Sequence, residues 1–315
     1  MLNELKKVFG YLRAKLAGKS KAEAQGNYDF SWYIVAWIDL LGQSEQLEEF
    51  DEIPTSGEEE RTFLEKARGT FGTVANFRKR ILELRDLLSR KIMLPPAIRD
   101  KLTPEQSTIY EKYAVTNVGV QFLCDSAILK ISLLHGGGSP LPSIDSLLSQ
   151  LAIIHLAHLG VGRPLRGSVS LGICAEMGDN DLYGQAVSRA HMLESKQADY
   201  PRIVIDETLL EYLQFCDGLP LSDQEQRLIR HLTTSIRSGL LRDTDKRLVL
   251  SFLGEKFRQM YGDQPTFRQA LQGASDYIQG EIKKHEASKN EKLGGRYVRL
   301  REYFKSQGCW LGTNG

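Results

Sequence analysis

The chain has 315 residues, of which 41% are hydrophobic and 26% charged, and a formal net charge of +1 at pH 7. This is the composition of a globular protein with enough apolar material for a large core. A net charge so close to zero gives no overall field that would attract nucleic acid or a membrane surface. The four cysteines match no zinc-ligand spacing. They are interpreted as small buried apolar residues in a reducing compartment.

The N-terminal region is expected to be a helix followed by a linker. Apolar side chains recur at helical spacing in residues 2–17, and residues 18–26 are small and polar. Charged residues interrupt this region too often for a signal peptide, and the longest apolar helical stretch, at 147–159, is too short to cross a bilayer. We therefore expect no membrane contact, a cytoplasmic location, and an N-terminal addition at 1–27.

A buried strand is expected at 28–39, because this run is rich in Trp, Tyr, Ile and Val. It ends at Asp39, just before a turn at Gly42. After a short helix, residues 58–92 keep helical apolar spacing over a long distance, and two prolines follow them. This long helical insertion is interpreted as a packing or dimerisation helix.

Two β-rich runs at 114–123 and 126–134 flank a two-residue connection. They predict a hairpin with Asp125 in its turn. The glycines at 136–138 lack the Lys and Ser/Thr that a phosphate-binding loop needs, so this stretch is interpreted as a hinge.

An apolar helix is expected to begin with Ser143 as its N-cap and to continue to about residue 159. His155 and His158 lie on it at helical spacing. No third metal ligand is in view, so both are interpreted as half-buried helix surface. The elements expected further along the chain are a strand at 166–175, a helix at 182–197, a short strand at 203–205 and mostly helices from about 207.

This order of elements predicts an α+β fold with a mixed or antiparallel sheet and packed helices, and not a doubly wound parallel sheet. A domain at 28–210, with the insertion at 58–92, would form the sheet. Residues 211–315 would form a C-terminal helical extension.

Asp39 and Asp125 are the residues best placed for chemistry. If the first strand pairs with the hairpin, both carboxylates project from the same end of the sheet. Two such carboxylates can hold Mg²⁺ or Mn²⁺ and leave positions for triphosphate oxygens. Taken one at a time, an Asp in either place is more often a cap or turn residue.

The residues around these two positions resemble class III nucleotide cyclases. Residues 37–44 (Trp-Ile-Asp-Leu-Leu-Gly-Gln-Ser) are similar to the family segment Phe-x-Asp-Ile-x-Gly-Phe-Ser/Thr, and the hairpin at 122–126 lies where the family has its second metal Asp. The usual Gly before that Asp is a Cys here. The resemblance implies a ferredoxin-like core and two divalent metal ions, Mg²⁺ or Mn²⁺. It assigns Asp39, the carbonyl of Leu40 and Asp125 as metal ligands.

Further motifs follow in the order found in the family. Residues 166–172 (Arg-Gly-Ser-Val-Ser-Leu-Gly) match its fourth strand, 183–194 match its motif helix, and 200–205 match the next strand. The combination looks like the bacterial pyrimidine cyclases of the Pycsar antiphage systems, which make cyclic UMP or cyclic CMP. The segment at 296–304 also resembles their C-terminal helix.

Two departures from the family concern catalysis. The family's transition-state Asn falls on Ser188, whose hydroxyl can still bind a ribose oxygen. Its Arg falls on Met192, which cannot replace a guanidinium on a phosphate. Arg166 and Arg189 are the nearest candidates for the missing charge, with a surface salt bridge as the plainer interpretation of Arg166.

Base recognition is expected to involve Gln121 and Asp181. In adenylate-type relatives these positions hold a Lys and an Asp that select adenine. A Gln amide both donates and accepts, which suits a pyrimidine edge. Phe50 is a candidate for stacking on a base, although such a residue more often belongs to a helix core.

The leading interpretation is a pyrimidine cyclase that converts UTP to cyclic UMP and pyrophosphate, with CTP as the alternative substrate. Class III sites form between two catalytic domains, so a single domain implies a head-to-tail homodimer. The messenger would act on a separate cyclic-nucleotide-binding effector. Two other interpretations are a degenerate cyclase-fold nucleotide sensor, which the missing Arg suggests, and a purine cyclase, against which the missing Lys weighs.

Overall fold

The computed structural model describes residues 29–48, 50, 53–89, 103, 104, 107, 118–133, 140–178, 181–220 and 222–312. The expected N-terminal helix and linker at 1–27 and the glycine stretch at 136–138 lie outside these residues.

Within the described residues, one eight-stranded sheet forms the centre of the molecule, in the order β2-β3-β1-β4-β6-β8-β7, with β5 paired to β4. β4 and β6 are parallel and the other pairs are antiparallel, so the sheet is mixed as predicted. Its strands are β1 (Asp29–Leu40), β2 (Val118–Leu123), β3 (Ser126–Ser132), β4 (Leu165–Glu176), β5 (Leu182–Gly184), β6 (Ile203–Ile205), β7 (Leu240–Arg242) and β8 (Leu248–Leu250).

The long strands β1 and β4 pair over their whole lengths and place Asp39 opposite Arg166. Alternate residues of β1 face opposite sides of the sheet. Ile34 and Ile38 join the main core, whereas the alternate residues Tyr33, Val35 and Trp37 join a smaller one. Both faces of this strand are therefore buried, which accounts for its almost unbroken apolar run.

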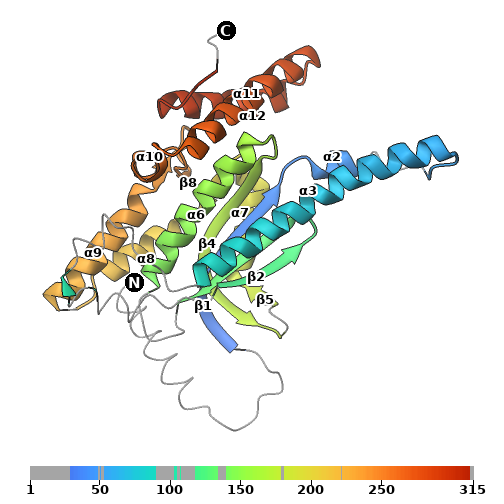
Figure 1. Cartoon of the computed structure of the whole chain (residues 1–315). Coiled ribbons are helices and arrows are strands. Elements are labelled where there is room, and N and C mark those ends of the chain that lie inside the picture. Colours follow the sequence, from blue (N-terminus) through green and yellow to red (C-terminus); the bar gives the residue numbers. More distant parts are fainter. Residues whose placement is uncertain are drawn as a thin grey trace.

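Helices cover both faces of the sheet. α3 (Gly57–Ser89), α6 (Leu141–Gly160), α8 (Glu207–Asp217) and α9 (Asp223–Ser238) contribute to the main core, and Figure 1 shows α3 and α6 in front of the strands. α7 (Gln185–Gln197) packs on the smaller core with β1 and β4. The α+β class predicted from the sequence is confirmed.

The long insertion is a single helix, α3, of 33 residues, preceded by the short α2 (Gln43–Glu48). At about 1.5 Å per residue, α3 is about 50 Å long. Its C-terminal half is anchored by Phe77, Ile81 and Leu88, which are buried, while its N-terminal half extends beyond the sheet in Figure 1. The helix predicted at 58–92 is therefore present over its described residues, 58–89.

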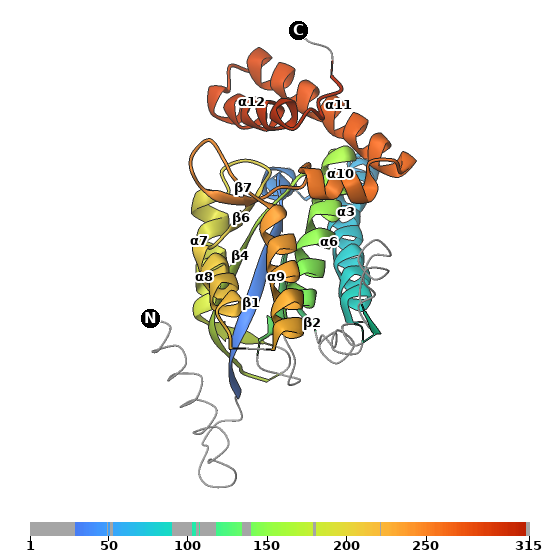
Figure 2. The same cartoon turned by 90° about the vertical axis from the view of Figure 1, so that its left-hand side faces the viewer.

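The C-terminal part contains two short strands after α9 that the sequence did not predict. β7 and β8 form a hairpin that extends the central sheet through β6. α10 (Glu255–Tyr261), α11 (Pro265–Ala287) and α12 (Glu291–Ser306) follow, and α11 and α12 lie past one end of the sheet in Figure 2. α11 contacts α6 so closely that only a glycine fits at Gly273, where a Cβ would lie 2.2 Å from the carbonyl oxygen of Gly160.

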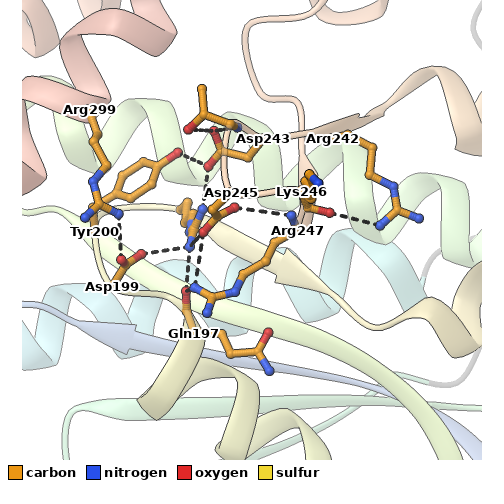
Figure 3. Close-up of polar contacts among 11 residues, drawn as sticks. Gln197, Asp199, Tyr200, Arg242, Asp243, Asp245, Lys246, Arg247 and Arg299 are labelled. Atoms are coloured by element: carbon orange, nitrogen blue, oxygen red, sulfur yellow. Dashed lines mark hydrogen bonds and ion pairs between the residues drawn. The ribbon is translucent and has the colours of Figure 1, made fainter.

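The buried Arg202 forms ion pairs that connect the β7–β8 turn to the rest of the sheet. The side chain of Arg202 is only 3% exposed and pairs with Asp243 and with Asp245 at 2.7 Å, both in the turn between β7 and β8. It also contacts Asp199 at 2.7 Å, to which Arg299 of α12 donates at 2.7 Å. Figure 3 shows how these carboxylates converge from the β7–β8 turn and from the chain after α7.

Three local expectations were wrong. Pro140 is the N-cap of α6 and Ser143 is buried inside the helix, where Pro142 of the first turn has no N–H that needs a partner. His155 is fully buried against Phe252 rather than half-buried, and burial lowers its pKa to about 3. Cys124 is exposed, because it lies in the hairpin turn.

None of the helices in the described ranges combines the length and the apolar character that a membrane crossing requires.

Candidate functional site

Asp39 lies at the carboxyl end of β1, and its side chain is 13% exposed. Its neighbours come from the strands on either side, since β3 places Ser126 and β4 places Arg166 opposite it. The Ser126 hydroxyl donates to Asp39 Oδ1 at 2.6 Å, and Arg166 Nε donates to Oδ2 at 3.2 Å. The antiparallel register of three strands thus builds a polar site around one carboxylate.

Asp125 lies beside this carboxylate, in the two-residue turn between β2 and β3. The amide of Leu40 donates to the backbone carbonyl of Asp125 at 3.4 Å. Cys124 has a positive φ of 50°, and its carbonyl accepts from Arg78 of α3 at 2.6 Å. The hairpin predicted from the spacing is confirmed, and its turn brings Asp125 close enough for its charge to raise the pKa of Asp39.

Glu194 of α7 is a member of the site that sequence reasoning missed. Its carboxylate is 4% exposed and pairs with Nε of Arg166. A signal for it was present: Ala186, Ala190 and Glu194 are spaced by four residues, and all three are buried against the sheet. An acidic residue that continues a stripe of small apolar residues is expected to meet a partner from the sheet.

The site carries more negative than positive charge. Burial raises the pKa of Asp39, the Ser126 hydrogen bond and the Arg166 charge oppose this rise, and the charge of Asp125 adds to it. Burial also raises the pKa of Glu194, again opposed by Arg166, while Asp39 and Asp125 add to the rise. A further cation would relieve the repulsion among these three carboxylates.

The arrangement fits a cation that is shared with a phosphorylated ligand. Among the described residues, no group of three or more His, Cys, Asp or Glu side chains forms a metal cage. Mg²⁺ is commonly held by one or two carboxylates together with substrate phosphates. Asp39 and Asp125, with the carbonyl of Leu40 next along the chain, are the residues that could hold such an ion.

Two residues expected to bind the base are joined to each other. Nε2 of Gln121 donates to Asp181 at 2.7 Å, and the amide of Leu182 donates to Oε1 of Gln121 at 3.4 Å. The pair links β2 to the turn before β5. Phe50 lies elsewhere, with its ring 5.3 Å from that of Phe63 in α3.

The remaining candidates lie on α7. Ser188 and Met192 are on its exposed face, and Met192 is 42% exposed. Arg189 is partly buried, and neither Ser188 nor Arg189 contacts the Asp39 cluster within the chain. Of the two candidate arginines, Arg166 is therefore the one that pairs with Asp39.

Comparisons with known proteins give likenesses of structure alone. No protein-family model matches the chain, and a comparison with curated proteins gives no match. The adenylyl cyclase CyaB from P. aeruginosa is 14% identical with a TM-score of 0.34, covering 71% of this chain and 93% of that one. A bacterial light-regulated adenylyl cyclase is 14% identical with a TM-score of 0.35, covering 66% and 98%.

A class III adenylyl cyclase-like ATP-binding protein from Pseudomonas aeruginosa is 11% identical, with a TM-score of 0.32, and covers 90% of this chain and 73% of that one. Superpositions as loose as these place no residue of the site. The candidate site rests on the register and contacts given above.

Proposed function

We propose that the chain is a nucleotide cyclase and that its substrate is a pyrimidine nucleoside triphosphate, with UTP converted to cyclic UMP and pyrophosphate. The observation that supports this most is the meeting of Asp39, Asp125 and Arg166 at one end of the β3-β1-β4 sheet. Two carboxylates and a guanidinium from separate stretches of the chain suit the binding of a metal–polyphosphate complex.

Asp39 and Asp125, with the carbonyl of Leu40, would hold Mg²⁺ or Mn²⁺. Bound there, divalent ions would neutralise phosphoryl oxygens and favour loss of a proton from the ribose hydroxyl. In the reaction, the 3′ oxygen forms a bond to the α-phosphorus, the bond from that phosphorus to the bridging oxygen breaks, and pyrophosphate leaves with the electron pair. The hydroxyl proton passes to solvent or a neighbouring base.

Arg166 would supply the positive charge that Met192 cannot. Its Nε lies against Asp39 and Glu194, so the guanidinium is held beside the carboxylates. A preorganised guanidinium stabilises the charge that spreads over phosphoryl oxygens in the transition state. Glu194 would orient this group from α7.

The hydrogen bond between Gln121 and Asp181 supports a pyrimidine substrate. The Asp181 carboxylate and the Leu182 amide orient the Gln amide, which keeps a second N–H and a second acceptor lone pair for a base edge. CTP is the alternative substrate, because either pyrimidine edge fits such a group. Phe50 is the weaker candidate for base contact, since its ring packs on α3.

A head-to-tail homodimer would complete the site. Ser188 is exposed on α7 and is free to enter the site of a second copy, where its hydroxyl would bind the ribose. The product would act as a second messenger in antiphage defence, through a separate cyclic-nucleotide-binding effector.

Product analysis tests this proposal. The purified chain is incubated with each of the four ribonucleoside triphosphates and Mn²⁺, and the products are identified by mass spectrometry. We expect a cyclic pyrimidine nucleotide that disappears in Asp39→Ala and Asp125→Ala but not in Asp86→Ala, a control on the exposed surface of α3. Cyclic AMP or cyclic GMP as the main product would instead indicate a purine cyclase. No product from any triphosphate would indicate a degenerate cyclase-fold sensor.

A further inference from the structure

A polar cavity of about 360 Å³ lies between the sheet and the C-terminal helices. Its walls come from the turn after β1, from the connection between α6 and β4, and from α11 and α12. The residues that matter are Gly42, Arg163, Tyr277, Arg296 and Tyr297. Ligand pockets in proteins commonly enclose about 300–1,000 Å³, so this cavity has room for a small ligand.

The walls of the cavity are held in place by close packing. Gly162 has a positive φ of 69°, and a Cβ there would lie 3.2 Å from the ring of Tyr277. The hydroxyls of Tyr277 and Tyr297 are 3.1 Å apart, and the ring of His285 stacks on Tyr297 with centroids 5.8 Å apart. These contacts join the α6–β4 connection to both α11 and α12, so packed side chains fix the shape of the cavity.

The charges around the cavity favour an anion. Arg163 and Arg296 both line it, and no carboxylate in the described part of the chain pairs with either guanidinium. Glu281, also in the lining, is engaged by Lys284 at 3.4 Å and His285 at 3.2 Å. Two guanidiniums that face one polar cavity without acidic partners form an arrangement that suits phosphate oxygens.

We propose that this cavity, whose lining includes neither Asp39 nor Asp125, is a phosphate-binding site for a small phosphorylated ligand. The phosphate group could belong to a free ligand or to the tail of a nucleoside triphosphate that extends from the catalytic site. The proposal does not require cyclase activity, because it rests on the cavity and its arginines alone.

The cavity adjoins the chain segment that carries the candidate active site. Gly42 is in its lining, and the amide of the adjacent Leu41 donates to the carbonyl of Pro164 at 3.0 Å. Asp39 and Leu40 directly precede this segment in the chain. The cavity and the candidate site thus share the backbone segment that ends β1 and begins the following turn.

Calorimetric titration of the full chain in EDTA tests the proposal, with inorganic phosphate and pyrophosphate as probes and succinate as a carboxylate comparison. We expect pyrophosphate to bind and succinate to bind at least tenfold more weakly. Arg163→Gln and Arg296→Gln should each weaken pyrophosphate binding at least tenfold. Arg268→Gln, an exposed arginine of α11 outside the cavity, and Asp39→Asn should leave it unchanged.

Competition with UTP separates the two sources of the phosphate. Pyrophosphate binding that survives saturating UTP indicates a separate ligand, whereas binding that UTP displaces, and that Arg163→Gln still weakens, indicates the substrate tail. The proposal is overturned if neither phosphate probe binds, or if binding is unchanged in both arginine variants. The melting temperature of each variant shows that it is folded, and loss of cyclase activity alone would not affect this outcome.

Discussion

Replacing Arg202 with methionine should destabilise the protein more than any change to its surface ion pairs. Arg202 is 3% exposed, and Asp243 beside it is 10% exposed. Although burial alone would lower the pKa of Arg202, its contacts with Asp245, Tyr200 and Asp199 raise it. The cation is thus held firmly by its acidic partners, and its removal leaves those carboxylates without their shared charge.

The loss of unfolding free energy in Arg202→Met can be estimated from the burial of Arg202 and its partners. Removing one partner of a buried ion pair typically costs about 3–5 kcal/mol. We expect the lower end, about 3 kcal/mol, because Asp245 is 29% exposed and keeps Arg247, and Asp199 is 36% exposed and keeps Arg299. At about 1.5 °C per kcal/mol for a chain of 315 residues, Arg202→Met should melt about 4–5 °C below the wild type.

Scanning calorimetry measures this difference, and Arg247→Gln is the matched control. Arg247 pairs with the same Asp245 at 3.2 Å but is 35% exposed, so its loss should cost only about 0–1 kcal/mol. The reasoning is refuted if the two variants melt at the same temperature. It would also fail if Arg202→Met were as stable as the wild type.

The effect of this substitution should depend on pH. Burial opposes but does not overcome the Arg202 and Arg247 contacts, which lower the pKa of Asp245 below its ordinary value of 3.8. A lowered pKa in the folded state contributes stability above the unfolded value, and this stability is lost as the pH falls through the folded value. The difference in melting temperature between wild type and Arg202→Met should therefore have its full size at pH 7 and decrease in strong acid.

Other predictions concern the site and the core. Because the pKa of Asp39 is raised in the folded state, ionisation of this carboxyl lowers the stability of the folded protein as the pH rises through the folded-state pKa. Asp39→Asn should therefore have a higher melting temperature than the wild type at pH 8, and the two melting temperatures should agree well below pH 3.8. Gln121→Lys should reduce the ratio of cyclic pyrimidine product to cyclic AMP by about tenfold, the worth of one hydrogen bond, and an unchanged ratio would exclude Gln121 from base selection. Phe77→Ala should cost about 3–5 kcal/mol in urea unfolding, whereas Phe71→Ala, at a side chain 61% exposed, should cost under about 1 kcal/mol.

The central strands could be predicted because their signals are local. β1 is an apolar run that ends at Asp39, and the hairpin around Asp125 follows from a two-residue connection between β-rich runs. Neither signal depends on distant parts of the chain. The same holds for α3, whose helical spacing is long enough to exclude a strand.

The hairpin of β7 and β8 could not be predicted in this way. Each strand has only three residues, and charged residues fill the turn from Asp243 to Arg247. These strands form because β8 pairs with β6 and because Arg202 binds the acidic turn. Both causes are tertiary, so the local pattern offered only a break between helices.

The candidate site was predictable in part for the same reason. The sequence places Asp39 and Asp125 together only on the condition that the first strand pairs with the hairpin, and β1 does pair with β3. The contact of Arg166 with Asp39 depends on the register of β4, and Glu194 enters through the packing of α7. Neither the register of β4 nor the packing of α7 can be derived from the spacing of residues in the sequence.

Binding of Mn²⁺ followed by electron paramagnetic resonance tests the central claim most directly. In the presence of 3′-deoxy-UTP, which lacks the attacking hydroxyl, the wild type should bind Mn²⁺ and lower the signal of the free ion. Asp39→Asn and Asp125→Asn should each lose most of this binding, and Asp86→Asn should keep it. Equal Mn²⁺ binding by the wild type and both site variants would contradict the shared metal site.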